Sequence, residues 1–461
     1  MRASFGRLKA AAEREPYPPW PVRRRRLESL LALLHDHRGE VCDAIAADFG
    51  HRSPQETQLL ELFPSLEAAR HALRHGASWM RDERRATSLW FLPGDSKVVY
   101  QPLGVVGIIA PWNYPLYLAA GPLVAALVAG NRAMLKLSEY TPGTCELLDR
   151  LVRQYFADDE VTVVEGDAGI AAEFSRLPFD HLLFTGSTAV GKHVMRAAAD
   201  NHTPVTLELG GKSPAIVGLD ADIDHAAERI VVGKTFNAGQ TCIAPDYALV
   251  PEAMVQQFID SAARVVARLY PDLPTTPDYS AIINARHFTR LTDYASEAKR
   301  AGANIIWLSA FAPDERTRRM PPVALTNVDD SMRIMHDEIF GPLLPVVPYR
   351  SLDDAIRFVA ARPRPLALYY FGRSRADVER VLHETHSGGV TVNDVILHIA
   401  QDSLPFGGIG PSGTGQYHGR DGFLAFSKAK GVFRQSRING MGLFNPPFGS
   451  RFARLMRLLL R

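Results

Sequence analysis

The densest cluster of chemically useful side chains surrounds Cys242, in the run Asn-Ala-Gly-Gln-Thr-Cys-Ile-Ala-Pro-Asp from 237 to 246. Small and polar residues before a cysteine are typical of a turn on which the sulfur is accessible. A thiol with an ordinary pKa of about 8.5 is only slightly ionised at neutral pH, so a nucleophilic cysteine needs help from its surroundings. Taken alone, the run fits a buried structural cysteine better than a nucleophile.

Glu208 lies upstream of Cys242, in the run Leu-Glu-Leu-Gly-Gly-Lys-Ser-Pro from 207 to 214. A glutamate between two leucines is costly to bury in its charged form. If it is buried, its pKa rises towards the working range of a general base. The Gly-Gly pair that follows lets another backbone segment or a ligand approach closely. The alternative is a solvated glutamate at a strand end, and this run alone favours that alternative.

Asn113 lies in the run Pro-Trp-Asn-Tyr-Pro from 111 to 115, directly after the apolar run from 104 to 110. Ligands of open α/β sheets bind beyond the carboxyl ends of the strands. An asparagine amide at such a position can donate a hydrogen bond to a developing oxyanion. The alternative is a simple asparagine turn between two prolines.

Three further motifs fit a bound nucleotide. The run Phe-Thr-Gly-Ser-Thr-Ala-Val-Gly-Lys from 184 to 192 leads from a strand through a turn into a helix, whose N-terminus suits a pyrophosphate. It lacks the G-x-G-x-x-G fingerprint and is weak evidence alone. Lys136 and Glu139 follow another strand and can hydrogen-bond ribose hydroxyls, whereas Glu338 and Phe340 offer a carboxylate and an aromatic ring beside a tight turn. Surface charges and a hydrophobic staple are the alternative interpretations of these last two motifs.

The elements that would position these residues alternate between strands and helices. We expect strands of one α/β unit at 105–109, 132–137, 161–164 and 181–184, with a buried helix at 116–130. Strands at 215–217, 247–251 and 304–307 indicate a second unit. This alternation predicts an α/β fold with a doubly wound sheet. Before it, we expect helices at 21–49 and 54–82 and an edge or arm strand at 97–100. The arginines at 23–26 are expected to form a solvated helix face rather than a site for an anionic partner.

Composition excludes several classes of protein. The 461 residues are 46% hydrophobic and 22% charged, so the chain has the material for about three folded units and is not disordered. Lys and Arg number 52 against 50 Asp and Glu, so there is no chain-wide field to bind nucleic acid. The N-terminus lacks the apolar region of a signal peptide, and prolines interrupt the charge-free stretch 98–131, which makes its pieces too short for a membrane span.

Three cysteines are too few for a disulfide framework and suit a reducing, cytoplasmic compartment. Cys42 and Cys145 lie in apolar helical patterns and are expected in the core. His71 and His75 are four residues apart on an expected helix, and His35 and His37 are two apart, but neither pair has a third ligand at recognisable spacing. No metal site is predicted.

Together and in this order, the motifs resemble the aldehyde dehydrogenase superfamily over nearly the whole chain. The run Ile-Ala-Pro-Asp-Tyr after Cys242 is similar to the class 3 branch, as are the runs at 388–394, 404–413 and 417–419. Within that branch, the segments 423–431 and 433–437 most resemble the coniferyl aldehyde dehydrogenase type.

This resemblance implies a domain plan. A Rossmann-like, doubly wound NAD-binding domain would take residues 1–93 and 104–209, and a second α/β catalytic domain would take 210–393. A small β oligomerisation arm and bridging segment would occupy 94–103 and 394–435, followed by a C-terminal tail at 436–461. Members of the class 3 branch are typically dimers that pair through such an arm, so we expect a homodimer.

The resemblance also implies roles. Cys242 would be the nucleophile and Glu208 the general base, and Asn113 would form an oxyanion hole with the backbone N–H of Cys242. The coenzyme-binding residues would be Trp112, Lys136, Glu139, Gly186, Ser187, Gly191, Glu338 and Phe340. Lys136 and Glu139 would hold the adenosine ribose, so NAD is favoured with NADP possible; Leu137 departs from the proline that many members have there.

The implied activity is oxidation of a hydrophobic aldehyde to its carboxylic acid through a cysteine thiohemiacetal and thioester. The aldehyde would be aromatic, such as coniferyl aldehyde, or a medium- or long-chain aliphatic one. One alternative is an acyl-CoA-linked, aldehyde-forming reductase of the same fold. Another is a peripheral membrane protein, because the tail from Arg451 to Arg461 alternates arginines with apolar residues and suggests a short amphipathic helix. A helix packed on its own or a partner subunit explains that pattern equally well.

Overall fold

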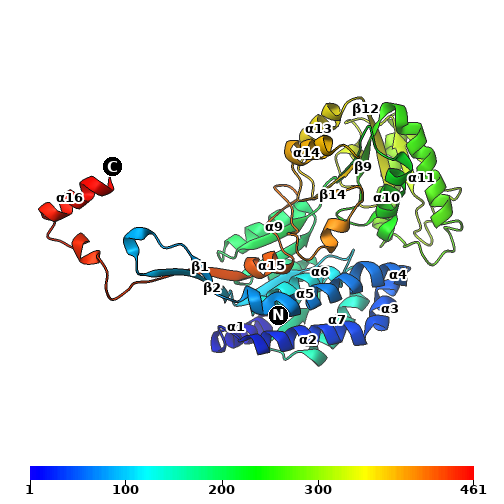
Figure 1. Ribbon diagram of the computed structural model, residues 1–461. Coiled ribbons are helices and arrows are strands. Elements are labelled where there is room, and N and C mark those ends of the chain that lie inside the picture. The colour runs from blue at the N-terminus through cyan, green and yellow to red at the C-terminus, as the bar shows by residue number, and fades with distance from the viewer. Residues whose placement is uncertain (461) are drawn as a thin grey trace.

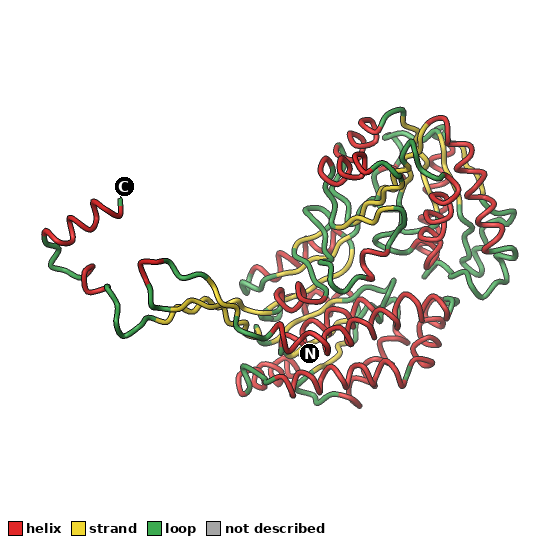
Figure 2. Tube along the Cα trace, in the orientation of Figure 1, coloured by secondary structure: helices red, strands yellow, loops and turns green. Residues whose placement is uncertain are grey.

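The computed structural model describes residues 1–460. Figure 1 shows two α/β bodies and a ribbon of strands that extends away from them and leads to the C-terminal helix α16 (Ser450–Leu459). The tube in Figure 2 makes the strand content of both bodies and of the ribbon visible. Within residues 1–460, no helix combines the length and the apolar character needed to cross a membrane.

The first body is built on a six-stranded sheet in the order β15-β7-β6-β3-β4-β5. All its strands are parallel except β15, which pairs antiparallel with β7. The strands are β3 (Val105–Ile109), β4 (Arg132–Lys136), β5 (Val161–Val164), β6 (His181–Gly186), β7 (Val205–Leu209) and β15 (Gly413–Thr414). The strand order reverses between β3 and β6, and such a switch point opens a crevice at the carboxyl ends of the strands. The predicted Rossmann-like, doubly wound sheet is confirmed.

Helices surround this sheet. The connections within it carry α6 (Tyr117–Ala129), α7 (Pro142–Tyr155), α8 (Ala168–Ser175) and α9 (Thr188–Ala199). The N-terminal region adds α1 (Arg2–Arg14), α2 (Trp20–Asp36), α3 (Arg38–Phe49), α4 (Pro54–Thr57), the π-helix η1 (Gln58–Leu62) and α5 (Phe63–Trp79). Every residue of α6 is buried, as are all residues of β3 and β4. Burial on both faces explains why these segments are continuously apolar rather than alternating.

The second body is built on a seven-stranded sheet in the order β10-β11-β12-β9-β8-β13-β14. Only the edge strand β10 is antiparallel to its neighbour. The strands are β8 (Pro214–Val217), β9 (Tyr247–Pro251), β10 (Asn304–Trp307), β11 (Val323–Thr326), β12 (Leu343–Tyr349), β13 (Ala367–Phe371) and β14 (Gly389–Val392). Its helices are α10 (Ile223–Thr235), α11 (Val255–Leu269), α12 (Ala285–Arg300), α13 (Leu352–Ala360) and α14 (Arg375–Glu384). The predicted second α/β unit is therefore present.

The ribbon is a three-stranded antiparallel sheet of β1 (Glu83–Arg85), β2 (Asp95–Pro102) and β16 (Ser427–Arg434). The helix α15 (Gly419–Ala425) comes directly before β16 in the chain. The expected strand at 97–100 lies within β2. β1 falls outside the segments expected to form the arm, and β15, from the expected bridging segment, joins the first sheet instead. The domain limits and the oligomeric role of the arm remain predictions.

Two expectations for the N-terminal region were wrong in detail. The expected helix at 21–49 is two helices that break at His37, and the one expected at 54–82 contains a π-helical turn and ends at Trp79. Figure 1 shows α2 and α5 lying against the first body.

The expectation of a solvated arginine face was right for Arg24 and Arg25, which are exposed, and wrong for Arg23 and Arg26, which are each only 1% exposed. Arg23 donates to the carbonyls of Val128 and Ala129 at the C-terminal end of α6, where unpaired carbonyls attract a cation. Arg26 pairs with Glu160 at 2.9 Å. A chain whose net charge is near zero can still bury individual cationic side chains where carbonyl or carboxylate acceptors are available. Cys42 and Cys145 are buried in helices, as expected.

Candidate active site

The three residues singled out for chemistry line one cavity of about 230 Å³ between the two bodies. Asn113 reaches it from the loop after β3, Glu208 from β7, and Cys242 from the turn that follows α10. Positions that are far apart in the sequence therefore meet beyond the carboxyl ends of the first sheet, where the strand order reverses.

The turn that presents Cys242 is held in an unusual backbone conformation. Asn237 and Ala238 both have φ near +50°, and Gly239 has φ of +77°. A Cβ at Gly239 would lie 2.3 Å from the carbonyl oxygen of Gly341, so only glycine fits. Successive left-handed residues cost energy and persist where their surroundings fix them, as often happens at functional sites.

Side chains from two other segments fix this turn. The backbone N–H of Asn237 donates to both carboxyl oxygens of Glu56 at 3.1 Å. Gln240 donates from Nε2 to the carbonyls of Asn237 and Ala281 and accepts from the N–H of Ile283 at 2.9 Å. These bonds place the half-buried Cys242 at the wall of the cavity.

The Cys242 thiol does not ionise readily in this environment. Burial raises its pKa to about 12, and the nearby carboxyl groups of Glu338 and Glu208 act in the same direction, while the backbone N–H groups of residues 242 and 243 oppose them. The protein alone thus keeps the sulfur protonated at neutral pH. A base must take the proton before the sulfur can act as a nucleophile.

Glu208 has the environment of such a base. Its side chain is 2% exposed, and both carboxyl oxygens are buried without a hydrogen-bond partner within residues 1–460. Burial raises its pKa well above the usual value. The solvated glutamate considered as the alternative is not found. A carboxyl group whose pKa is raised in this way can accept a proton near neutral pH.

Asn113 is buried, and hydrogen bonds hold both its side chain and its backbone carbonyl. Its side-chain Nδ2 donates to the carbonyl of Gln240 at 3.1 Å, which ties it to the Cys242 turn. Its backbone carbonyl accepts from Arg52 at 2.7 Å and from Asn237 at 3.0 Å. An amide NH₂ has two hydrogens, so one N–H remains for an oxyanion in the cavity.

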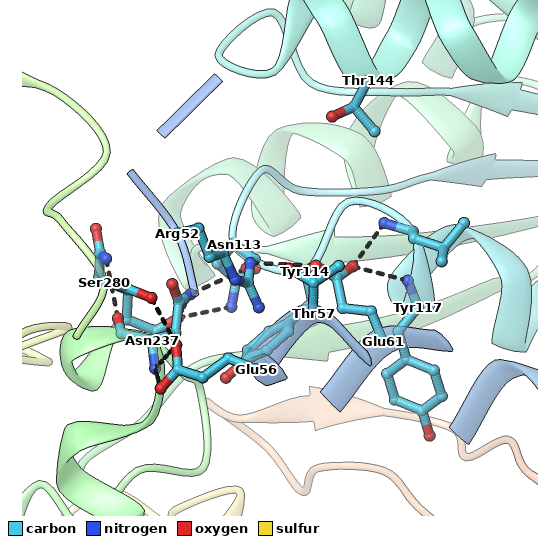
Figure 3. A network of polar contacts seen from close by, with 12 residues as sticks. Arg52, Glu56, Thr57, Glu61, Asn113, Tyr114, Tyr117, Thr144, Asn237 and Ser280 are labelled. Atoms are coloured by element: carbon cyan, nitrogen blue, oxygen red, sulfur yellow. Dashed lines mark hydrogen bonds and ion pairs between the residues drawn. The ribbon is translucent and has the colours of Figure 1, made fainter. Parts of the chain in front are cut away.

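A buried ionic network behind Asn113 was not predicted from the sequence (Figure 3). Arg52 and Glu61 are both 0% exposed and pair at 3.1 Å, and Glu61 also accepts from the N–H groups of Leu116 and Tyr117 where α6 begins. Charged residues at 52, 56 and 61, just before and within a helix otherwise expected to pack, were the available signal.

A larger cleft of about 1120 Å³ adjoins this cavity, and Trp112, Gly186 and Ser187 line both. The buried Lys136 and the exposed Glu139 also line the cleft. Ser187 caps the N-terminus of α9 by accepting from the N–H of Val190, which leaves the helix end facing the cleft. A volume of this size and an anion-binding helix terminus fit a dinucleotide.

The remaining expected coenzyme residues take two different positions. Glu338 and Phe340 line the smaller cavity, and the Phe340 ring lies edge-on to Trp112 with centroids 5.4 Å apart. A Cβ at Gly210 would lie 1.9 Å from a Glu338 carboxyl oxygen, so glycine makes room for that carboxylate. Burial raises the pKa of Glu338 to about 8. Gly191 lines neither cavity; its Cα packs against Leu209, which brings α9 close to β7.

Sequence reasoning missed three residues that line the smaller cavity and lie outside the motifs: Leu118, His287 and Arg290. His287 and Arg290 lie on one face of α12, and burial lowers the pKa of His287 to about 4. No local motif marks them, because α12 belongs to the second body. Within residues 1–460, no group of three or more His, Cys, Asp or Glu side chains could hold a metal ion.

A cysteine and a glutamate beside a dinucleotide-sized cleft, on a doubly wound α/β sheet, define the class of oxidoreductases that use a nicotinamide coenzyme. The model of the aldehyde dehydrogenase family matches residues 8–432. The chain belongs to the aldehyde dehydrogenase family.

Individual relatives agree with this assignment. The chain is 53% identical over 456 residues to a "Probable coniferyl aldehyde dehydrogenase" of Pseudomonas aeruginosa, covering 99% of this chain and 95% of the relative. It is 47% identical over 465 residues to the coniferyl aldehyde dehydrogenase of Pseudomonas sp. strain HR199, covering 100% and 96%.

Solved structures agree as well. The substrate-bound state of AldH from Staphylococcus aureus superimposes with a TM-score of 0.94 at 36% identity, covering 99% of both chains. Betaine aldehyde dehydrogenase from Staphylococcus aureus in complex with NAD⁺ gives a TM-score of 0.84 at 25% identity, covering 96% of this chain and 89% of that one. Membership of this family, together with an NAD⁺ complex among its structural neighbours, supports a nicotinamide cofactor for the chain.

Proposed function

We propose that the protein oxidises a hydrophobic aldehyde, with aromatic aldehydes such as coniferyl aldehyde preferred, to the carboxylic acid with NAD⁺ or NADP⁺. One observation carries the proposal: Cys242, Glu208 and Asn113 line a single cavity that adjoins a dinucleotide-sized cleft. Trp112, Leu118 and Phe340 give that cavity an apolar wall, which suits an aromatic or long aliphatic substrate. The printed names of the two bacterial relatives support the aromatic class.

The chemistry begins at Cys242. Its thiol loses its proton to water in the cavity, and the sulfur bonds to the aldehyde carbon to give a thiohemiacetal. Asn113 and the backbone N–H of Cys242 donate to the oxygen that becomes negative, and loss of one such donor costs about 3 kcal/mol of barrier. The covalent step makes the carbon tetrahedral, so that it holds a hydride it can give up.

The nicotinamide ring, when bound, accepts that hydride and leaves a thioester on Cys242. Glu208 then takes a proton from water as the water oxygen bonds to the thioester carbon. The carbon–sulfur bond breaks, its electron pair returns to sulfur, the sulfur takes the proton that Glu208 holds, and the acid is released. The raised pKa of Glu208 matches this role, because a base is most effective when its pKa lies near the working pH.

The coenzyme residues favour NAD. Glu139, exposed at the cleft, is placed to bond a ribose hydroxyl and would repel a 2′-phosphate. Lys136 acts in the opposite sense, because an ammonium group attracts the phosphate of NADP. We therefore expect a higher kcat/KM with NAD⁺ and measurable turnover with NADP⁺.

The proposal is tested by NAD(P)H release over a panel of aldehydes that contains coniferyl aldehyde, benzaldehyde and an aliphatic chain-length series. Cys242→Ala should abolish turnover, while Cys42→Ala, which removes a buried thiol that does not line the cavity, should leave it within about twofold. Dehydrogenase turnover by Cys242→Ala at the wild-type rate would refute the assignment of the nucleophile.

The acyl-CoA-linked alternative shares the thioester but passes it to a thiol. Adding coenzyme A to the assay distinguishes hydrolysis of the thioester from its transfer to a thiol. Hydrolysis predicts that the product is the free acid and that coenzyme A leaves the rate unchanged. Formation of an acyl-CoA thioester would favour the alternative.

A further inference from the structure

The motifs around Glu208 and Cys242 each contain a charged residue for which the proposed reaction has no role. Lys212 follows Glu208 by four residues, and Asp246 follows Cys242 by four residues. Both side chains are buried, with exposed fractions of 11% and 5%. Neither residue lines the smaller cavity or the larger cleft. Charged side chains are seldom buried unless they are paired, so the partners of these two residues indicate what they hold in place.

Lys212 and Asp246 form an ion pair with each other. The Lys212 ammonium group has three N–H donors, and each has an acceptor. One donates to the Asp246 carboxylate, and the other two donate to the carbonyls of Ile334 at 2.7 Å and Asp337 at 3.0 Å. The second carboxyl oxygen of Asp246 accepts from the N–H of Ile339 at 3.0 Å. The pair is therefore fully hydrogen-bonded, and its side chains bind one other segment, residues 334–339.

This segment carries Glu338, and the pair holds its backbone on both sides. Lys212 bonds the carbonyl of Asp337, which belongs to the peptide group before Glu338. Asp246 bonds the N–H of Ile339, which belongs to the peptide group after it. Because each peptide group is planar and rigid, holding both of them fixes the direction in which the Glu338 side chain leaves the backbone.

The Glu338 side chain is available to a ligand. It lines the smaller cavity, and its Oε1 is buried without a hydrogen-bond partner within residues 1–460. A buried acceptor left in this way costs free energy until a donor reaches it. A ribose hydroxyl of a nicotinamide coenzyme is such a donor, and the cavity adjoins the dinucleotide-sized cleft. We therefore expect coenzyme binding to depend on where Glu338 lies.

The nucleophile and the base do not need the pair to keep their positions. The Cys242 turn is held by a carboxyl group on α4, and Glu208 is paired with strands on both sides, β6 and β15. The backbone bond from the N–H of Asp246 to the carbonyl of Ser213, 2.7 Å long, survives any change of side chain. Loss of the pair should therefore displace the segment 334–339 and leave the thiol and its neighbouring carboxyl group in place.

Two side chains of α12 hold the same segment. Arg290 donates to the carbonyl of Ile339 at 2.8 Å, and the Tyr294 hydroxyl donates to the carboxylate of Asp337 at 2.8 Å. These bonds remain when the Lys212–Asp246 pair is replaced. We therefore expect the segment to shift rather than to unfold.

We propose that Lys212 and Asp246 form a positioning pair, which holds Glu338 in the orientation that binds the nicotinamide ribose of the coenzyme. This role rests on the proposed function, because it requires a nicotinamide coenzyme in the cleft. A buried ion pair adds little stability compared with an apolar pair of the same volume. Stability alone therefore does not explain why two charges are buried here.

The first test measures binding of NADH by its fluorescence and, separately, hydrolysis of p-nitrophenyl acetate by the full chain without coenzyme. This ester acylates a reactive cysteine, so its hydrolysis reports on Cys242 and Glu208 alone. Lys212→Met should raise the Kd of NADH about tenfold, which is the usual effect of losing a hydrogen bond to a charged group, and should leave ester hydrolysis within about twofold.

Lys9→Met is the matched control for this variant. Lys9 is also paired, with Asp180 at 2.9 Å, and it lines neither the smaller cavity nor the larger cleft. The same substitution there should leave the Kd of NADH and ester hydrolysis at their wild-type values.

The double variant Lys212→Met and Asp246→Leu separates positioning from stability. It leaves no charge buried without a partner, so its Tm should be higher than that of Lys212→Met. Its Kd for NADH should nevertheless stay about tenfold above wild type, because no side chain then bonds the peptide groups on the two sides of Glu338. Recovery of NADH binding together with Tm would overturn the positioning role.

Glu338→Ala identifies the residue through which the pair acts. Once that side chain is absent, the pair has nothing to position, so adding Lys212→Met to Glu338→Ala should not raise the Kd of NADH further. If the two effects multiply instead, the pair acts on coenzyme binding by another path and the proposal fails.

The outcomes separate this proposal from the proposed function. A wild-type protein that binds neither NADH nor NADPH, or ester hydrolysis that persists in Cys242→Ala, would contradict the proposed function itself. Wild-type binding with an unchanged Kd in Lys212→Met would overturn the positioning role alone. Equal loss of NADH binding and ester hydrolysis in Lys212→Met would show a general structural role and would also overturn it.

Discussion

At the scale of single residues, the site depends on two groups whose burial opposes their ionisation. The Cys242 thiol and the Glu208 carboxyl both have raised pKa values, chiefly because both are buried. Burial therefore favours the neutral form of both groups.

Glu208→Gln should separate acylation from hydrolysis. Glutamine has nearly the same shape but cannot accept a proton, so the first NADH should still form while turnover falls by about a hundredfold, within the range that general base catalysis supplies. Rapid mixing with excess coniferyl aldehyde measures both phases. A steady-state rate equal to that of wild type would show that another group activates the water.

Glu338 should make stability depend on pH. Its folded-state pKa is raised to about 8 from 4.5, so its contribution to stability is fully present below about pH 4.5 and is lost as pH rises through about 8. Between pH 5 and pH 8, the Tm of wild type should fall more steeply than that of Glu338→Gln. Calorimetry at several pH values measures the difference, and parallel curves would contradict the raised pKa.

Local runs of sequence were sufficient to single out the three cavity-lining residues that are proposed to react, but not those around them. Cys242, Glu208 and Asn113 each stand in a compact motif whose chemistry can be recognised without a fold. His287 carries no such motif, because its neighbours Trp112 and Tyr140 come from segments more than a hundred residues away. The burial of Arg23 was missed for the same reason, since its acceptors lie on α6.

At the scale of elements, α6 and the helices before it act as a support for Asn113, the proposed oxyanion residue. Glu61 caps the start of α6, Arg52 joins Glu61 to the backbone of Asn113, and Glu56 holds the turn of Cys242. One buried network therefore sets the positions of both Asn113 and Cys242 (Figure 3). The distance between these two groups should change if any member is lost.

Glu61→Gln tests this support. The amide can still accept from the start of α6 but leaves the Arg52 charge unpaired, and breaking a buried pair costs about 3–5 kcal/mol. We expect the free energy of unfolding to fall by about 3 kcal/mol and kcat to fall with it. Denaturant unfolding and aldehyde turnover measure the two effects.

Glu28→Gln is the matched control for that variant, because Glu28 forms an exposed pair with Arg24 on α2 at 2.8 Å. Exposed pairs contribute less than about 1 kcal/mol. If the two variants lost the same stability, the Arg52–Glu61 pair would not have the importance assigned to it.

Elements with a strong apolar pattern were predicted well and short polar ones were not. The strands β3 and β4 were placed to within one residue because burial on both faces leaves a continuous apolar run. β15 is only Gly413–Thr414, which carries no such pattern, and it was missed. The π-helical turn of η1 was missed as well, because its spacing differs from a regular helix by a single residue.

At the scale of the whole molecule, the arm and tail extend from the two bodies (Figures 1 and 2). Large apolar side chains are exposed along them: Leu89 at 75%, Ile438 at 85% and Leu460 at 83%. Exposed apolar surface of this extent marks an interaction site. The proposed homodimer and the proposed contact of the tail with a membrane would each cover part of it.

Removal of residues 436–461 should distinguish these two roles. If the arm alone forms the dimer, the shortened protein should keep its mass in light scattering and its aldehyde turnover, but should lose any flotation with anionic vesicles. A shift to the monomer mass would show that the tail belongs to the subunit interface, and flotation that persists without the tail would exclude it as the membrane contact.

The pairing of β15 with β7 has a consequence for synthesis on the ribosome. The strand that covers the edge of β7, and with it Glu208, is made about two hundred residues after β7 itself. Until then, a nascent chain displays an open sheet edge, which invites mispairing with other chains. We therefore expect the emerging protein to depend on chaperones between the synthesis of β7 and that of β15, and a product cut short before Gly413 to be inactive even though every residue proposed to react is already present.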